Sequence, residues 1–382
     1  MTTQNKRSPW VRGTFWASIG FYALVAFEFF YMVSPFAAYI YSVYGPGLEA
    51  LKLTESTGWL IGFFMPHIAR ETTSLLITWH EAIGGVILTA GLLTFAIGVV
   101  QIYRSKLTNK QAVTGGLYRW IRHPQYIALM IASFGMLLLW PRYLVLFGFI
   151  TVCFAYYMLA RMEERICRRE FPGYDEYTIR TGMFFPYSVE KYIHRLPFPD
   201  GRNVRILTGF ALYVFCIFIA FAGARLVHEN SINSLYVYET QTDVYLSVGR
   251  LDRDSIAALA ALAVNNPDVG YALSPYQTEK NRFINYVMPV DLYISEVPMY
   301  IPEGVRTAHH SPGRKDQSRY KIIFTLAHFS GESTADGRDI LRRAVNKSPL
   351  LEVWIDRPNQ RILRVLNPPE TEFYNGIPVP VF

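Results

Sequence analysis

Five stretches of the chain contain few polar residues and are long enough, or nearly long enough, to cross a membrane as helices. Crossing the hydrocarbon core takes about 20 apolar residues in a helix. The stretches cover residues 14–44, 77–102, 126–139, 143–159 and 206–227. The third and fourth are short, and only Trp140-Pro141-Arg142 separates them. Because proline cannot continue a helix and arginine can reach the membrane surface, we expect the tip of a tight transmembrane helical hairpin there.

The hydrophobic pattern changes after residue 227, and residues 228–382 are predicted to form a soluble α+β domain. Alternation over residues 236–248 predicts a strand, and a helix over 255–265 follows with Asp254 as its N-cap. We therefore expect two domains, 1–227 in the membrane and 228–382 outside it.

The rest of the C-terminal domain repeats the order of strand, helix and strand. The predicted elements are a strand at 321–329, a helix at 335–346 and a hairpin of strands at 351–356 and 361–366. Together with the first strand and helix, this order predicts a small sheet with helices on one face. No catalytic motif is visible in this domain, which makes it a possible docking surface for a protein partner.

Composition supports a membrane protein and excludes other classes. Apolar residues make up 51% of the 382 positions and charged residues only 18%, which excludes a disordered or fibrous chain. The net charge of +7 is unevenly distributed. Residues 1–227 hold 21 Lys and Arg against 12 Asp and Glu, whereas residues 228–382 hold 16 against 18. Basic residues beside long apolar stretches are typical of the cytoplasmic side of a membrane, so we expect no nucleic-acid partner.

The flanks of the apolar stretches predict the orientation. With five crossings, 17 Lys and Arg fall on one side of the membrane and 3 on the other. The N-terminus and both basic loops should therefore face the cytoplasm, with residues 228–382 on the opposite side. The membrane would be the cytoplasmic membrane of a bacterium or the endoplasmic reticulum of a eukaryote.

Cysteine and histidine spacing predicts no metal site. Cys153 and Cys216 lie in apolar stretches and Cys167 stands alone among charged residues, so we expect no structural disulfide either. The pair His309-His310 has no third ligand nearby and is predicted to be a solvated loop. We expect a structural role for the pair His80-Glu81, near the outer surface.

Two polar motifs lie at the predicted cytoplasmic edge, one before and one after the hairpin. Their candidate residues are Gly116, Tyr118, Arg122, His123, Pro124 and Tyr126 in the first, and Arg161, Glu163, Glu164 and Tyr177 in the second. Because a hairpin returns the chain to its starting side, Arg122 and His123 should lie beside Glu163 and Glu164. A simpler interpretation is that the arginines only anchor the helices in the membrane.

The order and spacing of these residues resemble the membrane methyltransferase family that includes isoprenylcysteine carboxyl methyltransferases and phospholipid N-methyltransferases. The resemblance covers about residues 80–190 and includes Gly116-x-Tyr118, Arg122-His123-Pro124-x-Tyr126 and Glu163-Glu164. It continues through Phe171, Tyr174, Tyr177 and Pro186. Two positions depart from the family pattern: Ala128 stands where glycine is frequent, and Pro172 interrupts the usual Phe-Gly pair.

The resemblance implies a site for S-adenosylmethionine formed by the residues of both motifs. Glu163 or Glu164 suits the cofactor's ammonium group and Arg122 its carboxylate, while His123 can donate or accept a hydrogen bond. The tyrosines of the two motifs could pack against the adenine or the sulfonium. The chain has no G-x-G-x-x-G loop, which argues against a Rossmann-type cofactor domain.

These observations predict an integral membrane methyltransferase that acts on a membrane lipid or another lipophilic acceptor. Arg161 and Glu164 are the predicted catalytic residues, with Arg161 orienting an anionic acceptor; the alternative for Arg161 is a membrane anchor. A non-catalytic membrane subunit that keeps the methyltransferase frame and docks a partner through residues 228–382 is the second interpretation. A transporter is less consistent with the sequence, since neither inverted repeats nor paired broken helices are visible.

Overall fold

The computed structural model describes residues 55–108, 113–193, 201–294, 296–302, 318–329, 335–367 and 380–382, with residues 23, 26, 27, 29, 30, 32–40 and 51 before them. Its contacts divide the chain into two compact units. Unit 1 comprises Met1–Tyr41, Leu88–Ser133 and Phe149–Asp200, and unit 2 comprises Ser42–Ile87, Phe134–Gly148 and Gly201–Phe382. The division into domains at residues 227 and 228 stays a prediction, and that boundary lies within one continuous helix.

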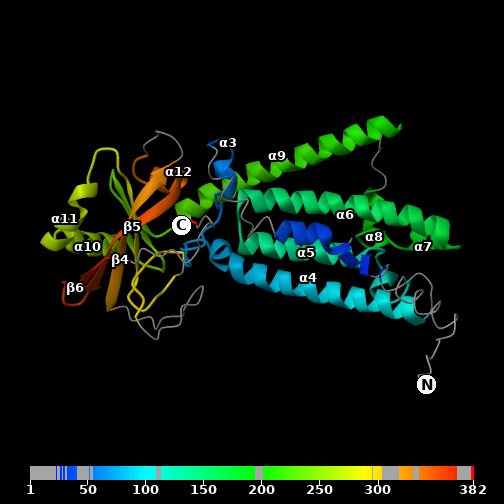
Figure 1. Ribbon diagram of the computed structural model, residues 1–382, viewed down its shortest axis with the longest axis horizontal. Coiled ribbons are helices and arrows are strands. Elements are labelled where there is room, and N and C mark those ends of the chain that lie inside the picture. Colours follow the sequence, from blue (N-terminus) through cyan, green and yellow to red (C-terminus); the bar gives the residue numbers. More distant parts are fainter. Residues whose placement is uncertain are drawn as a thin grey trace, which may run out of the picture. The chain divides into compact units, whose positions relative to one another are not determined.

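Within the part of the chain that the structure describes, three helices are long and apolar enough to cross a membrane (Figure 1). They are α4 (Leu75–Thr108), α6 (Tyr143–Glu170) and α9 (Arg202–Ser234). Helix α5 (Pro124–Leu139) is apolar but only 16 residues long. The predicted first stretch, 14–44, falls largely outside the described residues, so the count of five crossings stays a prediction.

The predicted interruption at Trp140-Pro141-Arg142 is confirmed, because α5 ends at Leu139 and α6 begins at Tyr143. In unit 1 the two helices touch where the ring of Tyr126 stacks on that of Tyr156, with centroids 4.9 Å apart. That α5 and α6 form a transmembrane hairpin stays a prediction, since α5 is shorter than a typical span.

Small residues let α4 and α5 approach closely in unit 1. A Cβ atom on Gly91 would lie 2.6 Å from the Ala132 nitrogen and 2.8 Å from the Ala128 oxygen, so no larger residue fits there without a shift. Close backbone approach through small residues is a common way to pack membrane helices. Short elements complete this part of the chain: η2 (Gly116–Arg119), α7 (Tyr174–Arg180) and α8 (Tyr187–Ile193).

Unit 2 contains a six-stranded sheet with the strand order β1-β2-β3-β4-β5-β6. The strands are β1 (Val237–Glu239), β2 (Asp243–Ser247), β3 (Phe283–Pro289), β4 (Arg319–Phe329), β5 (Ala344–Asp356) and β6 (Arg361–Leu366). Strands β2 and β3 pair in parallel and the other neighbours are antiparallel. The parallel pair needs a crossover, which α10 (Arg253–Val264), α11 (Pro267–Leu273) and η3 (Ser274–Tyr276) supply.

Several predicted elements of this domain are correct and others are wrong. The strand at 321–329 and the hairpin of β5 with β6 are confirmed. The single strand predicted at 236–248 is wrong, because β1 and β2 are two antiparallel strands joined by a turn. The predicted helix at 335–346 is also wrong in extent, since α12 covers only Asp339–Arg343 and β5 begins directly after it.

The predicted N-cap of α10 was two residues too late. The Asp252 carboxylate, rather than that of Asp254, accepts a hydrogen bond from the Ser255 backbone N–H at 2.8 Å. Both aspartates precede the apolar part of the helix, so the pattern alone does not distinguish them. Strand β3 was not predicted, because six of its seven residues are buried and the strand shows no alternation.

The sheet carries a hydrophobic core on each face, so the prediction of helices on one face only is wrong. On one face, Leu259 of α10 and Val269 of α11 are in the same core as Val353 of β5. On the other face, Ile340 of α12 and Ile232 near the end of α9 are in a core with the inward side chains of β2, β3 and β4.

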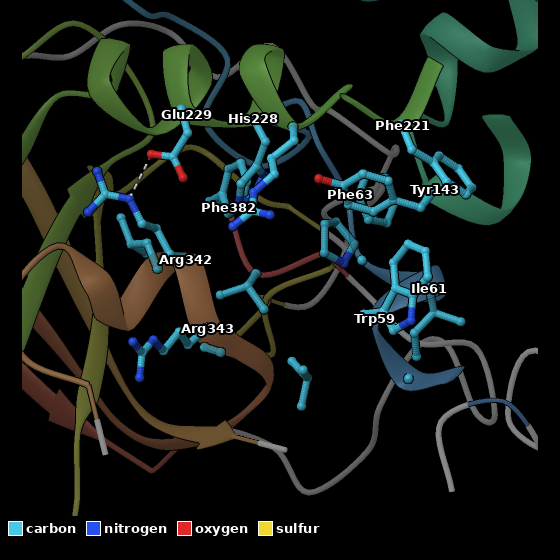
Figure 2. A pocket seen from close by; sticks show the side chains of 18 of the residues that line it. Trp59, Ile61, Phe63, Tyr143, Phe221, His228, Glu229, Arg342, Arg343 and Phe382 are labelled. Atoms are coloured by element: carbon cyan, nitrogen blue, oxygen red, sulfur yellow. Dashed lines mark hydrogen bonds and ion pairs between the residues drawn. The ribbon is translucent and has the colours of Figure 1, made fainter. Parts of the chain in front are cut away.

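Unit 2 also contains a cavity of about 990 Å³ (Figure 2). Its walls come from α3 (Glu55–Gly58), η1 (Trp59–Ile61), the start of α6, the second half of α9, α12 and β5.

The predicted loop pair His309-His310 lies outside the described residues.

Candidate functional site

The first polar motif is held as a compact loop before α5. Gly116 has a φ of +62°, a left-handed conformation that favours glycine, and a Cβ there would lie 2.6 Å from the Gln101 side chain. Gln101 accepts a hydrogen bond from the Leu117 N–H at 3.2 Å. Pro124 begins α5, where its missing N–H and fixed φ suit the first helical turn. These contacts direct the side chains before Pro124 toward the end of α6.

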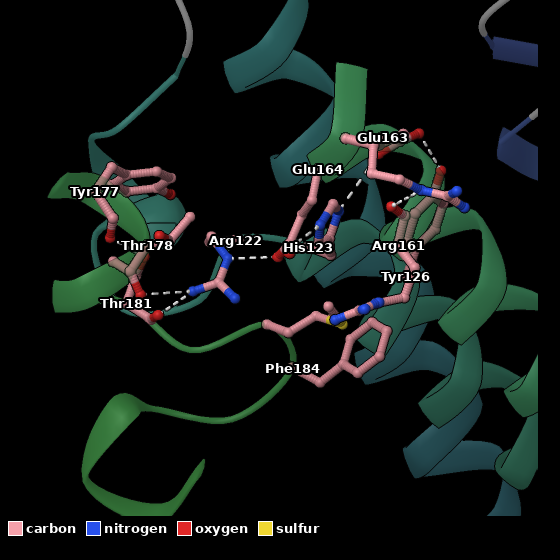
Figure 3. Close-up of polar contacts among 12 residues, drawn as sticks. Arg122, His123, Tyr126, Arg161, Glu163, Glu164, Tyr177, Thr178, Thr181 and Phe184 are labelled. Carbon is pink, nitrogen blue, oxygen red and sulfur yellow. Dashed lines mark hydrogen bonds and ion pairs between the residues drawn. The ribbon is translucent and has the colours of Figure 1, made fainter. Parts of the chain in front are cut away.

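Arg122 is buried and almost completely satisfied by the protein. Its Nε donates to the Glu164 carboxylate at 2.6 Å, and its Nη1 donates to the main-chain carbonyls of Thr178, at 3.2 Å, and Thr181. Figure 3 shows the guanidinium between Thr178 and Thr181, at the end of α7, on one side and Glu164 on the other. Its Nη2 lies 4.0 Å from a Glu190 oxygen. The arginine therefore ties α5, α6 and α7 together.

A second carboxylate, Glu190 of α8, fixes the loop that follows α7. It accepts hydrogen bonds from three successive backbone N–H groups, those of Met183, Phe184 and Phe185. The same loop pairs with the first motif, because the Arg122 N–H donates to the Gly182 oxygen at 2.8 Å. A Cβ on Gly182 would overlap the Phe185 oxygen, so this position requires glycine.

His123 lies between the two glutamates of the second motif. Its Nδ1 is 3.3 Å from Glu163 and its Nε2 is 3.7 Å from Glu164, although the side chain is only 4% exposed. Both ring nitrogens thus face carboxylate oxygens at ion-pair distance, without meeting hydrogen-bond geometry. Burial alone would lower the pKa of His123, but the two carboxylates outweigh it and raise the pKa above its usual range. The predicted meeting of Arg122 and His123 with Glu163 and Glu164 is thus present.

Three tyrosines surround this charged group. Tyr126 donates from its hydroxyl to Glu163, and its ring stacks against His123 with centroids 5.5 Å apart. The hydroxyl of Tyr118 donates to Gln125 at 2.9 Å, and that of Tyr177 donates to the Tyr118 carbonyl at 2.5 Å. Burial raises the pKa of Tyr177 to about 12, so its hydroxyl keeps its proton at neutral pH.

The remaining candidates differ in accessibility. Arg161 is on the same helix as Glu163 and Glu164 and is exposed. Glu163 is 33% exposed, in contrast to the buried Glu164. Arg168 lies 4.0 Å from Glu164 and is half exposed. The cluster thus combines a buried arginine–glutamate pair with one partly accessible carboxylate, and two accessible arginines lie on the same helix.

The sequence did not indicate several residues that shape this cluster. Glu190, Gly182, Gln101 and the two carbonyls of α7 contribute through contacts with segments distant along the chain. Glu190 could have been suspected as an acidic residue in the first turn of α8, but its partners lie in the preceding loop. Among the residues that the structure describes, no group of three or more His, Cys, Asp or Glu side chains is placed to hold a metal ion.

Residues 82–173 match the family model PEMT, described as phospholipid methyltransferase. The match confirms the family resemblance predicted from the sequence. It contains the first motif, α5, α6 and the pair Glu163-Glu164, whereas α7 and α8, which complete the charged cluster, follow the matched segment. The C-terminal sheet lies outside the matched segment.

Two curated relatives are similar over part of the chain. The nickel-cobalt-cadmium resistance protein NccN of Alcaligenes xylosoxydans xylosoxydans is 30% identical over 123 residues, which cover 29% of this chain and 57% of that protein. The cobalt-zinc-cadmium resistance protein CzcN of Cupriavidus metallidurans is 30% identical over 116 residues, covering 28% and 52%. The chain thus spans about half the length of the curated relatives it matches. No solved structure matches it significantly.

Proposed function

We propose that this protein is a membrane-embedded methyltransferase that uses S-adenosylmethionine and acts on a lipophilic or membrane-delivered acceptor. The observation that carries the proposal is the charged cluster around His123, a buried side chain 3.3 Å from Glu163, which is 33% exposed, and 3.7 Å from the buried Glu164. A shielded charged cluster that exposes one carboxylate can bind the cationic group of a ligand through a charge-assisted hydrogen bond. Its position in the segment that matches methyltransferases makes the cofactor a consistent ligand.

The donor set fits the charges of the cofactor. Glu163 is the accessible carboxylate, and it suits the ammonium group of the amino-acid portion. His123 offers a ring N–H to an oxygen of the ligand, and the raised pKa favours its protonated form. Tyr118, Tyr126 and Tyr177 offer aromatic faces for adenine or a cationic sulfur. The cofactor, when bound, supplies a methyl group that is activated for transfer.

Arg122 and Glu164 are best described as positioning residues. Their charges are matched by each other and by the α7 carbonyls, so their effect on a ligand passes through the geometry of the loop. Together with Gly116 and Pro124 they hold His123 against the end of α6. Fixed polar groups of this kind reduce the reorganisation needed when a reactant binds.

Arg161 is proposed to orient an anionic acceptor. It lies one helical turn before Glu164 and its side chain is exposed, so a group arriving from the membrane surface could reach it. Glu164 stays a candidate for a direct catalytic role only if the pair with Arg122 opens on binding.

A non-catalytic membrane subunit is the second candidate, and one observation favours it. The guanidinium of Arg122 and the carboxylate of Glu164 are bonded within the protein, as expected for a structural ion pair. In this alternative the methyltransferase frame is a scaffold, and the sheet domain of residues 228–382 docks a protein partner.

Calorimetric titration of the purified full chain with S-adenosylmethionine and with its demethylated product separates the two candidates. We expect binding by the wild type, and about tenfold weaker binding in Glu163→Gln and in His123→Gln, because each loses a contact with a charged ligand. Arg168→Gln is the matched control, since it alters the same helix end outside the proposed contacts. Absence of binding by the folded wild type would overturn the enzyme proposal and favour the scaffold.

A further inference from the structure

The cavity of unit 2 has one apolar and one basic half (Figure 2). Aromatic rings from η1, α6 and α9 line one half, and arginines from α9 and α12 line the other. Its volume of about 990 Å³ is at the upper end of the range of small-molecule sites. A ligand that fills it would therefore need an apolar part and a polar, anionic part.

The apolar half is built around three rings that contact one another. Trp59 lies 5.7 Å from Tyr143 and 5.5 Å from Phe221, and Tyr143 lies 6.0 Å from Phe221, measured between ring centroids. Tyr143 is the first residue of α6, and Phe221 is in α9. None of the residues in the most apolar stretch of α9 is buried within the protein. Tryptophan and tyrosine are enriched where membrane helices leave the hydrocarbon, so this group of rings is typical of a membrane interface.

One face of α9 links the two halves. Phe218, Phe221, Arg225 and His228 follow one another at spacings of three and four residues, so they line the same side of the helix. The face changes along its length from aromatic to basic. From Phe218 to Arg225 the helix rises about 10 Å, a distance comparable to that between the acyl region and the phosphate of a lipid.

The basic half holds two arginines that form no ion pair with any residue that the structure describes. Arg342 donates to Glu229 at 3.0 Å and to Asp339 at 2.5 Å, so its charge is matched. Arg225 and Arg343 are exposed, and neither has a carboxylate partner among the described residues. A guanidinium binds phosphate oxygens through two parallel hydrogen bonds, which makes a phosphate diester a suitable partner.

We propose that this cavity binds one anionic phospholipid from the adjacent leaflet. Its phosphate lies at Arg225 and Arg343, and an acyl chain lies against Trp59, Tyr143 and Phe221. A lipid, rather than a soluble phosphate, is the ligand because the apolar half continues onto the exposed, membrane-facing side of α9. The bound lipid joins η1, α6 and α9 to the sheet through α12. This lipid site does not depend on methyl transfer.

The test compares lipids retained by the full chain. Protein in nanodiscs of phosphatidylcholine mixed with phosphatidylglycerol is transferred to mild detergent, and the retained lipids are counted by native mass spectrometry. We expect one phosphatidylglycerol to be retained in preference to phosphatidylcholine. Arg225→Gln combined with Arg343→Gln should weaken this retention by about tenfold or more, because both phosphate contacts are lost.

Two further variants serve as controls for the lipid-retention experiment. Arg202→Gln changes an arginine at the other end of α9 that does not line the cavity, and it should retain the lipid normally. Arg343→Gln alone, at an exposed position, is used if the double variant fails to fold. Equal retention of the two lipids by the wild type, or unchanged retention in the arginine variants, would overturn the proposal. Displacement of the lipid by glycerol 3-phosphate at equal concentration would also overturn it, since the site would then recognise only the phosphate.

Discussion

Two buried histidines, one in each unit, lie between pairs of glutamates, yet they are built in different ways. His123 lies 3.3 Å and 3.7 Å from Glu163 and Glu164, whereas His67 lies 2.9 Å from Glu81 and 3.4 Å from Glu296. Both histidine side chains are 4% exposed. Similar imidazole–carboxylate chemistry therefore occurs twice in one chain, and the surroundings must decide what each cluster does.

The His67 cluster connects distant segments of unit 2. Its members come from the loop before α4, from α4 and from the segment after β3, and the ring is packed 4.9 Å from Trp140 and 5.5 Å from Phe63. Glu81 therefore pairs with His67, in line with the structural role predicted for it. The guanidinium of Arg142 lies over the Phe63 ring at 4.6 Å, completing a tightly packed junction.

The His123 cluster is drawn from two motifs about 40 residues apart and contains additional charges. Arg122 satisfies Glu164, which leaves Glu163 as the carboxylate with an exposed surface. The segment that matches the methyltransferase family, residues 82–173, includes His123, Glu163 and Glu164 and begins after His67. Accessibility does not separate the two clusters, because Glu81 is 30% exposed and Glu163 is 33% exposed. The comparison teaches that a buried histidine between carboxylates does not by itself indicate a ligand site; the His123 cluster is distinguished by its place in the segment that matches the methyltransferase family.

The largest effect should come from breaking the charge pair beside His123. Arg122→Met leaves the Glu164 carboxylate buried without its guanidinium, so we expect the free energy of unfolding to fall by about 3–5 kcal/mol. Thermal and denaturant unfolding in detergent would measure this loss. The double variant Arg122→Met with Glu164→Leu should regain much of the stability, because no uncompensated charge remains. An unchanged unfolding midpoint in the single variant would contradict the buried pair.

A smaller loss is expected at the other cluster. His67→Gln removes a charged contact between α4 and the sheet domain, and we expect a decrease of about 1.5–3 kcal/mol in the free energy of unfolding. Cofactor affinity should stay unchanged, in contrast to His123→Gln. A weaker cofactor affinity in His67→Gln, with stability preserved, would remove the distinction between the two clusters.

The pH dependence sharpens the comparison further. Burial alone would lower the pKa of His67, but Glu296 and Glu81 outweigh it and raise the pKa. A group with a raised pKa stabilises the folded state fully below its unfolded pKa of about 6.5, and this contribution disappears as the pH rises through the folded value. Unfolding temperature should therefore fall as the pH is increased above neutrality. His67→Gln should show a shallower fall, and an identical slope in both proteins would show that His67 carries no linked proton.

The smallest effect is expected from Arg168→Gln. This side chain is 51% exposed and lies 4.0 Å from Glu164, so the pair is screened by water. We expect less than about 0.5 kcal/mol in the free energy of unfolding. Double-variant analysis with Glu164→Gln would measure the coupling, and a coupling as large as that of Arg122 would mean that both arginines share the buried charge.

The sequence by itself determined the helices α4, α6 and α9, the interruption at Trp140-Pro141-Arg142 and the meeting of His123 with Glu163 and Glu164. Long apolar stretches and proline act locally, and the order of the motif residues restricts which side chains can meet. Strand β4 and the hairpin of β5 and β6 were likewise predictable, because their apolar residues and turn lie within one short segment.

The tertiary structure alone decided the partners of these residues. Arg122 binds carbonyls of α7, Glu190 binds the loop after Gly182, and Glu296 reaches His67 from beyond β3. None of these contacts produces a periodic pattern in the sequence, because each joins two segments that are far apart along the chain. The core on the second face of the sheet includes Ile232 of α9. It likewise depends on a contact between the end of α9 and strands that are distant from it in sequence.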